Sequence, residues 1–191
     1  MSESKRSNQE KILAAASELF VEGGVSALSV RAIAAKAGIS TIGIYSHFQG
    51  KQGILDALYI EGFELVYEAM AAVPTNASHQ QVLGSVDSYL NVATNHEGHY
   101  RLIFGEVDTG YLPSEHAIAA RDKAFGRLIE IGASALPADA SRADAMQLAL
   151  DIWAVIHGYV SIFHHAMRDN SVNMDWRNSV KNAVLRLLET T

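Results

Sequence analysis

Apolar side chains recur along this chain with the spacing of α-helices. The first stripe has the i, i+1, i+4, i+7, i+8 pattern of one buried helical face, and it consists of Ile12, Leu13, Ala16, Leu19 and Phe20. Ser7 and Glu10 precede it with the spacing of a capping box. The Gly23–Gly24 pair after it supplies the left-handed conformation that ends many helices. The pattern predicts a helix from about Ser7 to Gly23.

Two short helices joined by a tight turn are expected next. Ser29 is a good N-cap for an apolar-striped segment that Gly38 closes. After the turn Gly38–Ile39–Ser40, a second short helix is expected from Thr41 to Phe48. Helix, glycine-containing turn and helix together form a helix-turn-helix pattern. Any three-helix bundle also contains such a turn, so the pattern alone does not establish DNA binding.

The rest of the chain also has helical periodicity. Further helices are expected at about 51–72, 79–94, 97–105, 115–135, 141–168 and 173–189. No segment alternates with the period of a strand, and the three prolines, Pro74, Pro113 and Pro137, fall between the periodic stretches. The sequence therefore predicts an all-α fold of about nine helices.

Composition and charge narrow the class of protein. A hydrophobic content of 49% is enough for one sizeable core or two small coupled ones, and the absence of cysteine excludes disulfides and thiolate metal sites. The polar first residues and the lack of a long apolar run indicate a cytoplasmic protein without a membrane span. The net charge is −6, yet residues 1–53 carry six basic and four acidic side chains. A mildly basic head on an acidic body is suited to contact with phosphate, and we expect two domains, 1–53 and 54–191.

The head carries a motif with several fixed spacings. Gly38–Ile39–Ser40 is followed by Ile44-Tyr45-Ser46-His47-Phe48-Gln49-Gly50-Lys51. Over about the first 60 residues, and above all from Leu28 to Leu58, the chain resembles the helix-turn-helix of the TetR family of bacterial regulators. The resemblance implies a regulator that binds double-stranded DNA.

The resemblance also implies which residues meet DNA. The base-reading positions are Ser40, Thr41, Ile42, Gly43 and Ser46. Their short side chains predict hydroxyl hydrogen bonds and apolar packing on thymine methyls. The phosphate-contacting positions are Tyr45, His47 and Lys51, while Arg31 matches a position that reaches a base or a phosphate, and the backbone N–H of Ser29 is a phosphate donor.

Several of these positions have other readings. Without the motif, Lys51 reads as a solvated charge, His47 as a turn cap and Tyr45 as half-buried packing. Gly43 departs from the alanine or threonine that is frequent in the family, which predicts either weaker base readout or a closer backbone approach to DNA. Ile44 and Phe48 are expected to face the core.

The second half has a less specific resemblance. The segments 98–105 and 153–158, GHYRLIFG and WAVIHG, are similar to a TetR subgroup named for its Trp-His-Gly motif. This similarity implies an all-α sensing domain whose last two helices form a four-helix bundle with a second copy. The expected dimer residues are Ile152, Ile156, Tyr159, Phe163, Val180, Val184 and Leu187. The expected pocket for an apolar or amphipathic effector is lined by Phe63, Tyr67, Tyr100, Phe104, Phe125, Trp153 and His157. For Trp153 and His157, plain core packing is the preferred explanation.

Other classes of function fit less well. The sequence has no GxSxG elbow, P-loop or GxGxxG, and its acidic residues form no recognisable pair, so we expect neither an enzyme nor a cofactor. His96 and His99 have i, i+3 spacing rather than that of a zinc-binding helix, so no metal is expected. The main rivals are an enzyme of unrecognised type and a helical interaction module that has lost DNA binding. The leading hypothesis is a homodimeric repressor that a small-molecule effector releases from a pseudo-palindromic operator.

Overall fold

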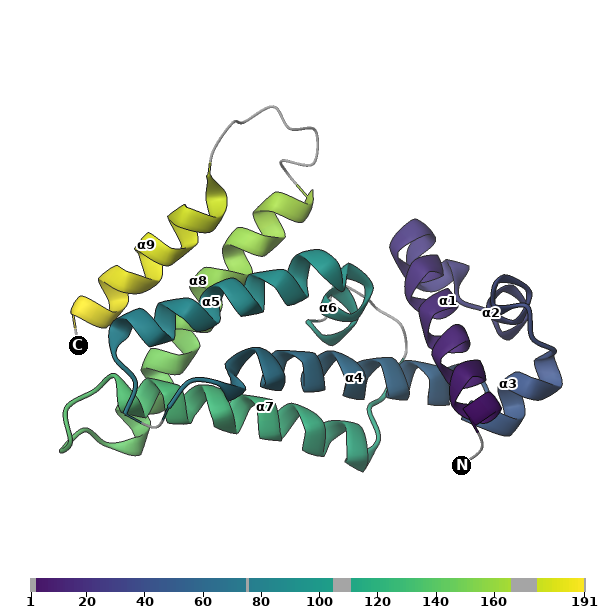
Figure 1. The fold of residues 1–191 in the computed structure, drawn as a ribbon, viewed down its shortest axis with the longest axis horizontal. Coiled ribbons are helices and arrows are strands. Elements are labelled where there is room, and N and C mark those ends of the chain that lie inside the picture. Colours follow the sequence, from purple (N-terminus) through teal and green to yellow (C-terminus); the bar gives the residue numbers. More distant parts are fainter. Residues whose placement is uncertain (1–2, 75, 105–110, 166–174, 191) are drawn as a thin grey trace. The chain divides into compact units, whose positions relative to one another are not determined.

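The computed structural model describes residues 3–74, 76–104, 111–165 and 175–190, and within these ranges it contains nine helices and no strand (Figure 1). The helices are α1 (Glu3–Ala27), α2 (Val30–Ala37), α3 (Thr41–Phe48), α4 (Lys51–Ala71), α5 (His79–Asn95), α6 (Glu97–Ile103), α7 (Glu115–Ser134), α8 (Arg142–His165) and α9 (Trp176–Glu189). The predicted all-α fold is confirmed. The expected end of one helix at about residue 168 and the expected start of the next at about residue 173 both fall in residues 166–174, which lie outside the described residues.

The chain divides into two compact units. Unit 1 comprises residues 1–65 and 96–121, and unit 2 comprises residues 66–95 and 122–191. This division differs from the boundary at residue 53 that composition suggested. Helices α4 and α7 each contribute residues to both units. The distribution of charge along the sequence does not reveal a division of this kind.

The first helix begins and ends differently from the sequence pattern. It starts at Glu3, so the prediction of a cap at Ser7 is wrong. The residues before Ser7 have ordinary helix propensity, and a capping box does not prevent a helix from extending through it. The regular helix is interrupted at Gly24, where φ is 63° and ψ is −155°, close to the predicted end.

The core of unit 1 explains why its short helices are stable. α1 packs on α2, and α2 packs on α3. Their facing side chains are almost fully buried, and they include Ile12, Ala16, Phe20, Ile33 and Ile44. Full burial of one such aliphatic or aromatic side chain contributes about 1.5–3 kcal/mol. An isolated eight-residue helix is marginal in water, so this burial holds α2 and α3 in place.

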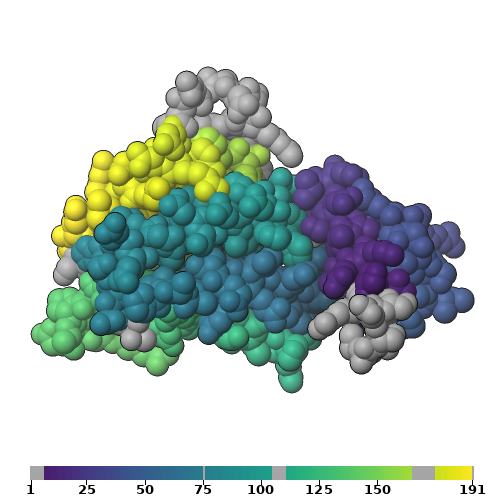
Figure 2. All heavy atoms as spheres, viewed as in Figure 1, coloured from purple at the N-terminus to yellow at the C-terminus, as the bar shows by residue number. Residues whose placement is uncertain are grey.

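Unit 2 is built around α5, α8 and α9. The three helices pack pairwise, and Figure 2 shows α9 lying against α5 on the visible face of the unit. Their shared core includes Leu90, Val160, Val180, Val184 and Leu188. At the edge of this core Lys181 Nζ lies 3.1 Å from Asp87 Oδ2, which joins α9 to α5.

Within unit 1, a buried histidine joins helix α6 to α4. α6 packs on α1. His99 is 9% exposed, and its Nε2 lies 3.0 Å from Glu61 Oε2 on α4. The hydrogen bond with His99 lowers the pKa of Glu61 below its ordinary value of 4.5, although partial burial of the carboxyl opposes the shift. The ionised carboxylate is therefore the form that holds α6 against α4.

A carboxyl whose pKa is depressed on folding gives stability that is present above its unfolded pKa and is lost as the pH falls through the folded value. We therefore expect the free energy of unfolding to fall between about pH 5 and pH 3, and to fall less steeply in Glu61→Gln. Glu64→Gln, which changes an exposed carboxylate on the same helix, is the control and should keep the wild-type slope. Urea unfolding at a series of pH values measures all three. Parallel curves for wild type and Glu61→Gln would contradict this role.

Candidate nucleic-acid interface

The turn between α2 and α3 is fixed from both sides. Gly38 ends α2 with φ 66° and ψ 32°, and its N–H donates to the carbonyls of Ala34 and Ala35. The left-handed conformation favours glycine because it has no Cβ. The Oγ of Ser40 then accepts from Gly43 N at 3.1 Å and caps the start of α3. The predicted helix-turn-helix is present, and its two helices begin and end where the sequence indicated.

Helix α3 turns one face to the core and another to solvent. Ile44 is fully buried and Phe48 is partly buried, as predicted for core positions. Ile42 is 79% exposed and Tyr45 is 57% exposed, although both are large and apolar. Of the other base-reading candidates, Ser40, Thr41 and Ser46 are exposed, whereas Gly43 is partly buried. Thr41, Ile42 and Ser46 are therefore accessible to a ligand on α3.

Gly43 serves the packing of the turn. A Cβ at this position would lie 2.6 Å from Cγ2 of Ile39 and 3.6 Å from Oγ of Ser40. The side chain of Ile39 thus occupies the space that an alanine or threonine would need. This intramolecular contact gives a reason for glycine that neither of the sequence-based explanations, weak readout or close approach to DNA, included.

Three serines of the predicted interface already bond to helix backbone. Ser29 Oγ accepts from Ala32 N at 3.1 Å and caps α2, in the same way that Ser40 caps α3. Ser46 Oγ lies 3.0 Å from the carbonyl oxygen of Gly43, to which it donates. Capping aligns the N-terminal amides of α2 and α3, the groups that bind phosphate in many proteins. The sequence anticipated the cap at Ser29, but it gave no signal for the bond made by Ser46.

The cationic side chains of this region differ in whether an acidic side chain of the protein already binds them. Residues 23–55 contain no aspartate or glutamate and carry Arg31, Lys36 and Lys51. Arg31 is exposed. Lys36 Nζ instead lies 2.8 Å from Glu22 and 3.1 Å from Glu18, and these hydrogen bonds raise the pKa of its ammonium group. The charge of Lys36 is thus largely matched within the protein.

The two other predicted phosphate ligands are half-buried. Lys51 Nζ lies 3.4 Å from the carbonyl of Val25, so this side chain also ties the start of α4 to the end of α1. His47 is partly exposed. The contact of Lys51 differs from the free surface charge that the sequence alone allowed as an alternative.

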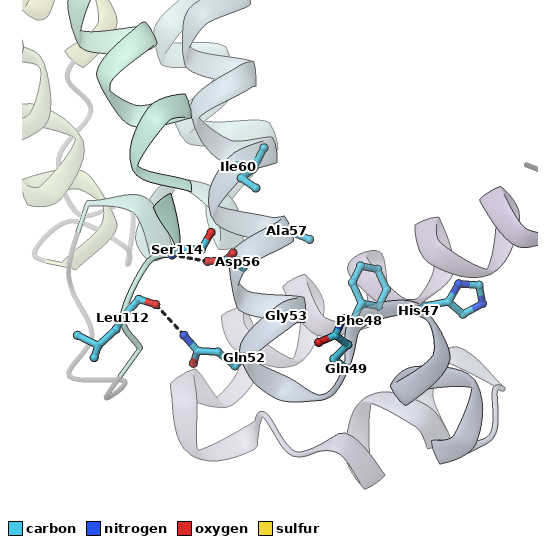
Figure 3. A pocket seen from close by; sticks show the side chains of 10 residues that line it. All are labelled: His47, Phe48, Gln49, Gln52, Gly53, Asp56, Ala57, Ile60, Leu112 and Ser114. Atoms are coloured by element: carbon cyan, nitrogen blue, oxygen red, sulfur yellow. Dashed lines mark hydrogen bonds between the residues drawn. The ribbon is translucent and has the colours of Figure 1, made fainter. Parts of the chain in front are cut away.

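Residues 111–114, here called the strap, are bonded to the first turns of α4, and Figure 3 shows Leu112 and Ser114 beside Gln52 and Asp56. Gln52 Nε2 donates to the carbonyl of Leu112 at 2.7 Å. Asp56 Oδ1 accepts from the hydroxyl of Tyr111 at 2.6 Å and from Ser114 N at 3.0 Å. Burial by itself would raise the pKa of Asp56, but the hydrogen bonds from Ser114 and Tyr111 outweigh it and lower that pKa.

The strap borders an open groove of about 490 Å³ that α3 and α4 also line. The strap has no signal in the sequence, because its partners lie more than fifty positions apart and no local pattern connects them.

The predicted effector residues fall into separate aromatic clusters. In unit 1, the ring centroid of Phe104 lies 4.6 Å from that of Tyr100 and 6.0 Å from that of Phe63. In unit 2, Trp153 lies 6.4 Å from Phe125 and 5.9 Å from His157 between ring centroids.

Two of the predicted effector residues in unit 2, Trp153 and Tyr67, make further contacts. The indole Nε1 of Trp153 donates to the hydroxyl of Tyr89 at 3.2 Å, and Lys123 lies 4.0 Å over the ring of Tyr67. Three grooves described by the structure have other linings. None of the seven predicted effector residues is among those linings.

The predicted dimer residues divide by exposure. Tyr159, Phe163 and Leu187 are partly exposed. The other four are buried inside the protomer, each at most 5% exposed, and they are Ile152, Ile156, Val180 and Val184. Their burial argues against a direct contact with a second copy. The two apolar stripes on which that expectation was based, one on α8 and one on α9, pack within one chain.

Comparison with known proteins supports the family resemblance. Residues 12–58 match the family model described as bacterial regulatory proteins, tetR family. Residues 82–174 match the model described as the C-terminal domain of tetracyclin repressor-like proteins. The chain is also 33% identical over 107 residues to a Bacillus subtilis protein named "Probable HTH-type transcriptional regulator YttP". This alignment covers 54% of the chain and 52% of YttP, so the chain spans about half the length of that relative.

Solved structures extend the likeness in fold to nearly the whole chain. The protein SCO4313 superposes with a TM-score of 0.80 at 20% identity, and the match covers 97% of each chain. SmeT in its complex with triclosan has a TM-score of 0.65 at 18% identity, and the match covers 96% of this chain and 90% of SmeT. Because these two family models match residues 12–58 and 82–174, the chain belongs to the TetR family of bacterial regulatory proteins.

Proposed function

We propose that this protein is a cytoplasmic, sequence-specific DNA-binding regulator of transcription that acts as a repressor. The observation that carries the proposal is the exposed face of α3, which is presented by a rigid turn on a segment without acidic residues. A helix of this kind enters the major groove, where its side chains meet base edges. The family is one of transcriptional regulators, which agrees with this use of the helix.

In the proposed complex, α3 reads bases while its surroundings bind phosphate. Thr41, Ile42 and Ser46 face the bases, because they are exposed along one side of α3. Phosphate contacts come from the exposed Arg31 and Tyr45, with His47 and Lys51 at the margin and the capped N-terminus of α2 at Ser29. These contacts fix the register of the protein on the duplex.

Selection of a random duplex library on the purified protein tests this function. We expect an enriched pseudo-palindrome whose half-sites are about 34–36 Å apart, because a two-fold dimer places two recognition helices in successive major grooves. A retained pool without any shared sequence, or no retention at low salt, would contradict the proposal.

Two charge-removing variants sharpen the same test. Arg31→Gln should weaken binding to every duplex and reduce the slope of log K against log salt by about 1, because one phosphate contact is lost. Lys36→Gln is the matched control, since Glu18 and Glu22 already hold that ammonium group. Its salt slope should equal that of the wild type. Equal loss in both variants would mean that general charge, and not the exposed face, drives binding.

The proposed dimer forms through the exposed side of α8 with α9. The segment Arg142–His164 is long and apolar enough to cross a membrane by length and composition; its most apolar 18-residue window has a mean hydropathy of 1.3, and 28% of that window is buried inside the protomer. Ile162 on α8 is 49% exposed, and the partly exposed Phe163 stacks on Trp176 of α9 at 4.6 Å. An apolar helix with this much uncovered surface fits contact with a second copy.

Ile162→Glu is expected to give a monomer, because burying a carboxylate without a partner is unfavourable. Leu112→Glu is the control, since Leu112 is exposed but belongs to unit 1, and it should leave the dimer intact. Analytical ultracentrifugation separates the two states. A monomeric wild type, or a dimeric Ile162→Glu, would contradict this interface.

We further propose that an apolar or amphipathic small molecule releases the protein from DNA by binding near Trp153. Phe125, Trp153 and His157 form a row of partly exposed rings in unit 2, and such rings line many small-molecule sites. Trp153, His157 and Gly158 also carry the resemblance to the Trp-His-Gly subgroup. The complex of the structural relative SmeT with triclosan supports a ligand of this chemistry.

A panel of apolar and amphipathic compounds, triclosan included, tests release of the selected duplex. At least one compound should release the wild type, and Trp153→Leu should need about tenfold more of it because an aromatic contact is lost. The affinity of Trp153→Leu for DNA without compound should equal that of the wild type. Release of both proteins at the same concentration, or of neither by any compound, would count against the proposal.

A further inference from the structure

The exposed face of α3 has few groups that can make paired hydrogen bonds with a base. Arginine, lysine, asparagine and glutamine make the bidentate contacts that usually distinguish bases in the major groove. The sequence of α3, TIGIYSHF, contains none of them. Ser40 Oγ accepts from the backbone of Gly43, and Ser46 Oγ donates to it, so each hydroxyl retains only part of its hydrogen-bonding capacity.

The same face carries an unusual amount of apolar surface. Ile42 is 79% exposed and Tyr45 is 57% exposed, whereas Ile44 between them is fully buried. Residues 42 and 45 are three apart on the helix and are therefore neighbours on its surface. An aliphatic side chain that is exposed on a recognition helix gains free energy only where the groove offers an apolar group. In the major groove that group is the methyl on C5 of a pyrimidine.

We propose that Ile42 is a specificity-determining residue that recognises the C5-methyl group of a pyrimidine in the operator. This inference rests on the proposed function, because it requires α3 to lie in the major groove. The occupant is duplex DNA, since residues 23–55 carry only positive formal charge and the exposed Arg31 lies on the preceding helix. The half-site then carries thymine opposite Ile42. A cytosine pair at that place is disfavoured, and 5-methylcytosine restores part of the affinity.

The test uses duplexes derived from the selected operator. Each thymine in a half-site is replaced in turn by deoxyuridine, which keeps base pairing and removes only the methyl group. At one position or two adjacent ones, wild-type protein should bind the uracil duplex about fourfold more weakly, the effect of one buried methyl group. Ile42→Ala should bind the thymine and uracil duplexes equally at that position. Fluorescence anisotropy at fixed salt gives the dissociation constants.

Two controls separate a methyl contact from general apolar surface. Leu112→Ala removes a side chain that is also 79% exposed but lies outside α3, and it should keep the full difference between thymine and uracil. At the same position, a 5-methylcytosine–guanine pair should bind the wild type more tightly than a cytosine–guanine pair. Ile42→Ala should bind these two duplexes equally.

The outcomes distinguish this inference from the function on which it rests. An enriched operator that wild-type protein binds equally well with uracil at every position overturns the inference and leaves the regulator intact. A thymine preference that persists unchanged in Ile42→Ala also overturns it. The comparison of thymine with uracil uses the wild type alone, so it does not depend on the folding of a variant. A library without any enriched sequence overturns the proposed function and the inference together.

Discussion

The direction of α3 depends on the turn that joins it to α2. Gly38 ends α2 in a left-handed conformation, and Ser40 caps the start of α3 by accepting a hydrogen bond from the backbone N–H of Gly43. Ile39 between them fills the space beside Gly43 that any larger residue would need. These three constraints leave the turn little freedom, so they determine which side of α3 is buried and which is exposed. The proposed function is a consequence of that exposed side.

The chemistry of the exposed side of α3 depends on which polar groups of unit 1 are already bonded within the protein. Lys36 is occupied by two carboxylates of α1, and Ser40 and Ser46 are bonded to backbone, so neither charge nor hydroxyls dominate the surface. Arg31 remains for phosphate and Ile42 for the bases. Recognition then divides into a positional part and a part that reads sequence, and the second is largely apolar.

Local signals in the sequence predicted much of the fold. Ser29, Gly38 and the periodic apolar positions gave α2 and α3 their observed limits, because caps and helical faces are encoded within a few residues. Contacts between distant segments left no such signal. The strap of Tyr111 on Asp56 could not be predicted, and the stripes of Ile152 on α8 and Val184 on α9 look the same whether they pack within one chain or between two. Periodicity identifies a buried face but not its partner.

Amide hydrogen exchange, measured with and without a selected duplex, shows which surface DNA covers. We expect slower exchange in residues 29–51, where α2, the turn and α3 lie, because DNA covers that surface and suppresses local opening. Residues 79–95 of α5, in the other unit, should exchange at the same rate in both samples. Slowed exchange that leaves residues 29–51 unchanged and appears elsewhere would contradict the account, because DNA would then be bound by another surface.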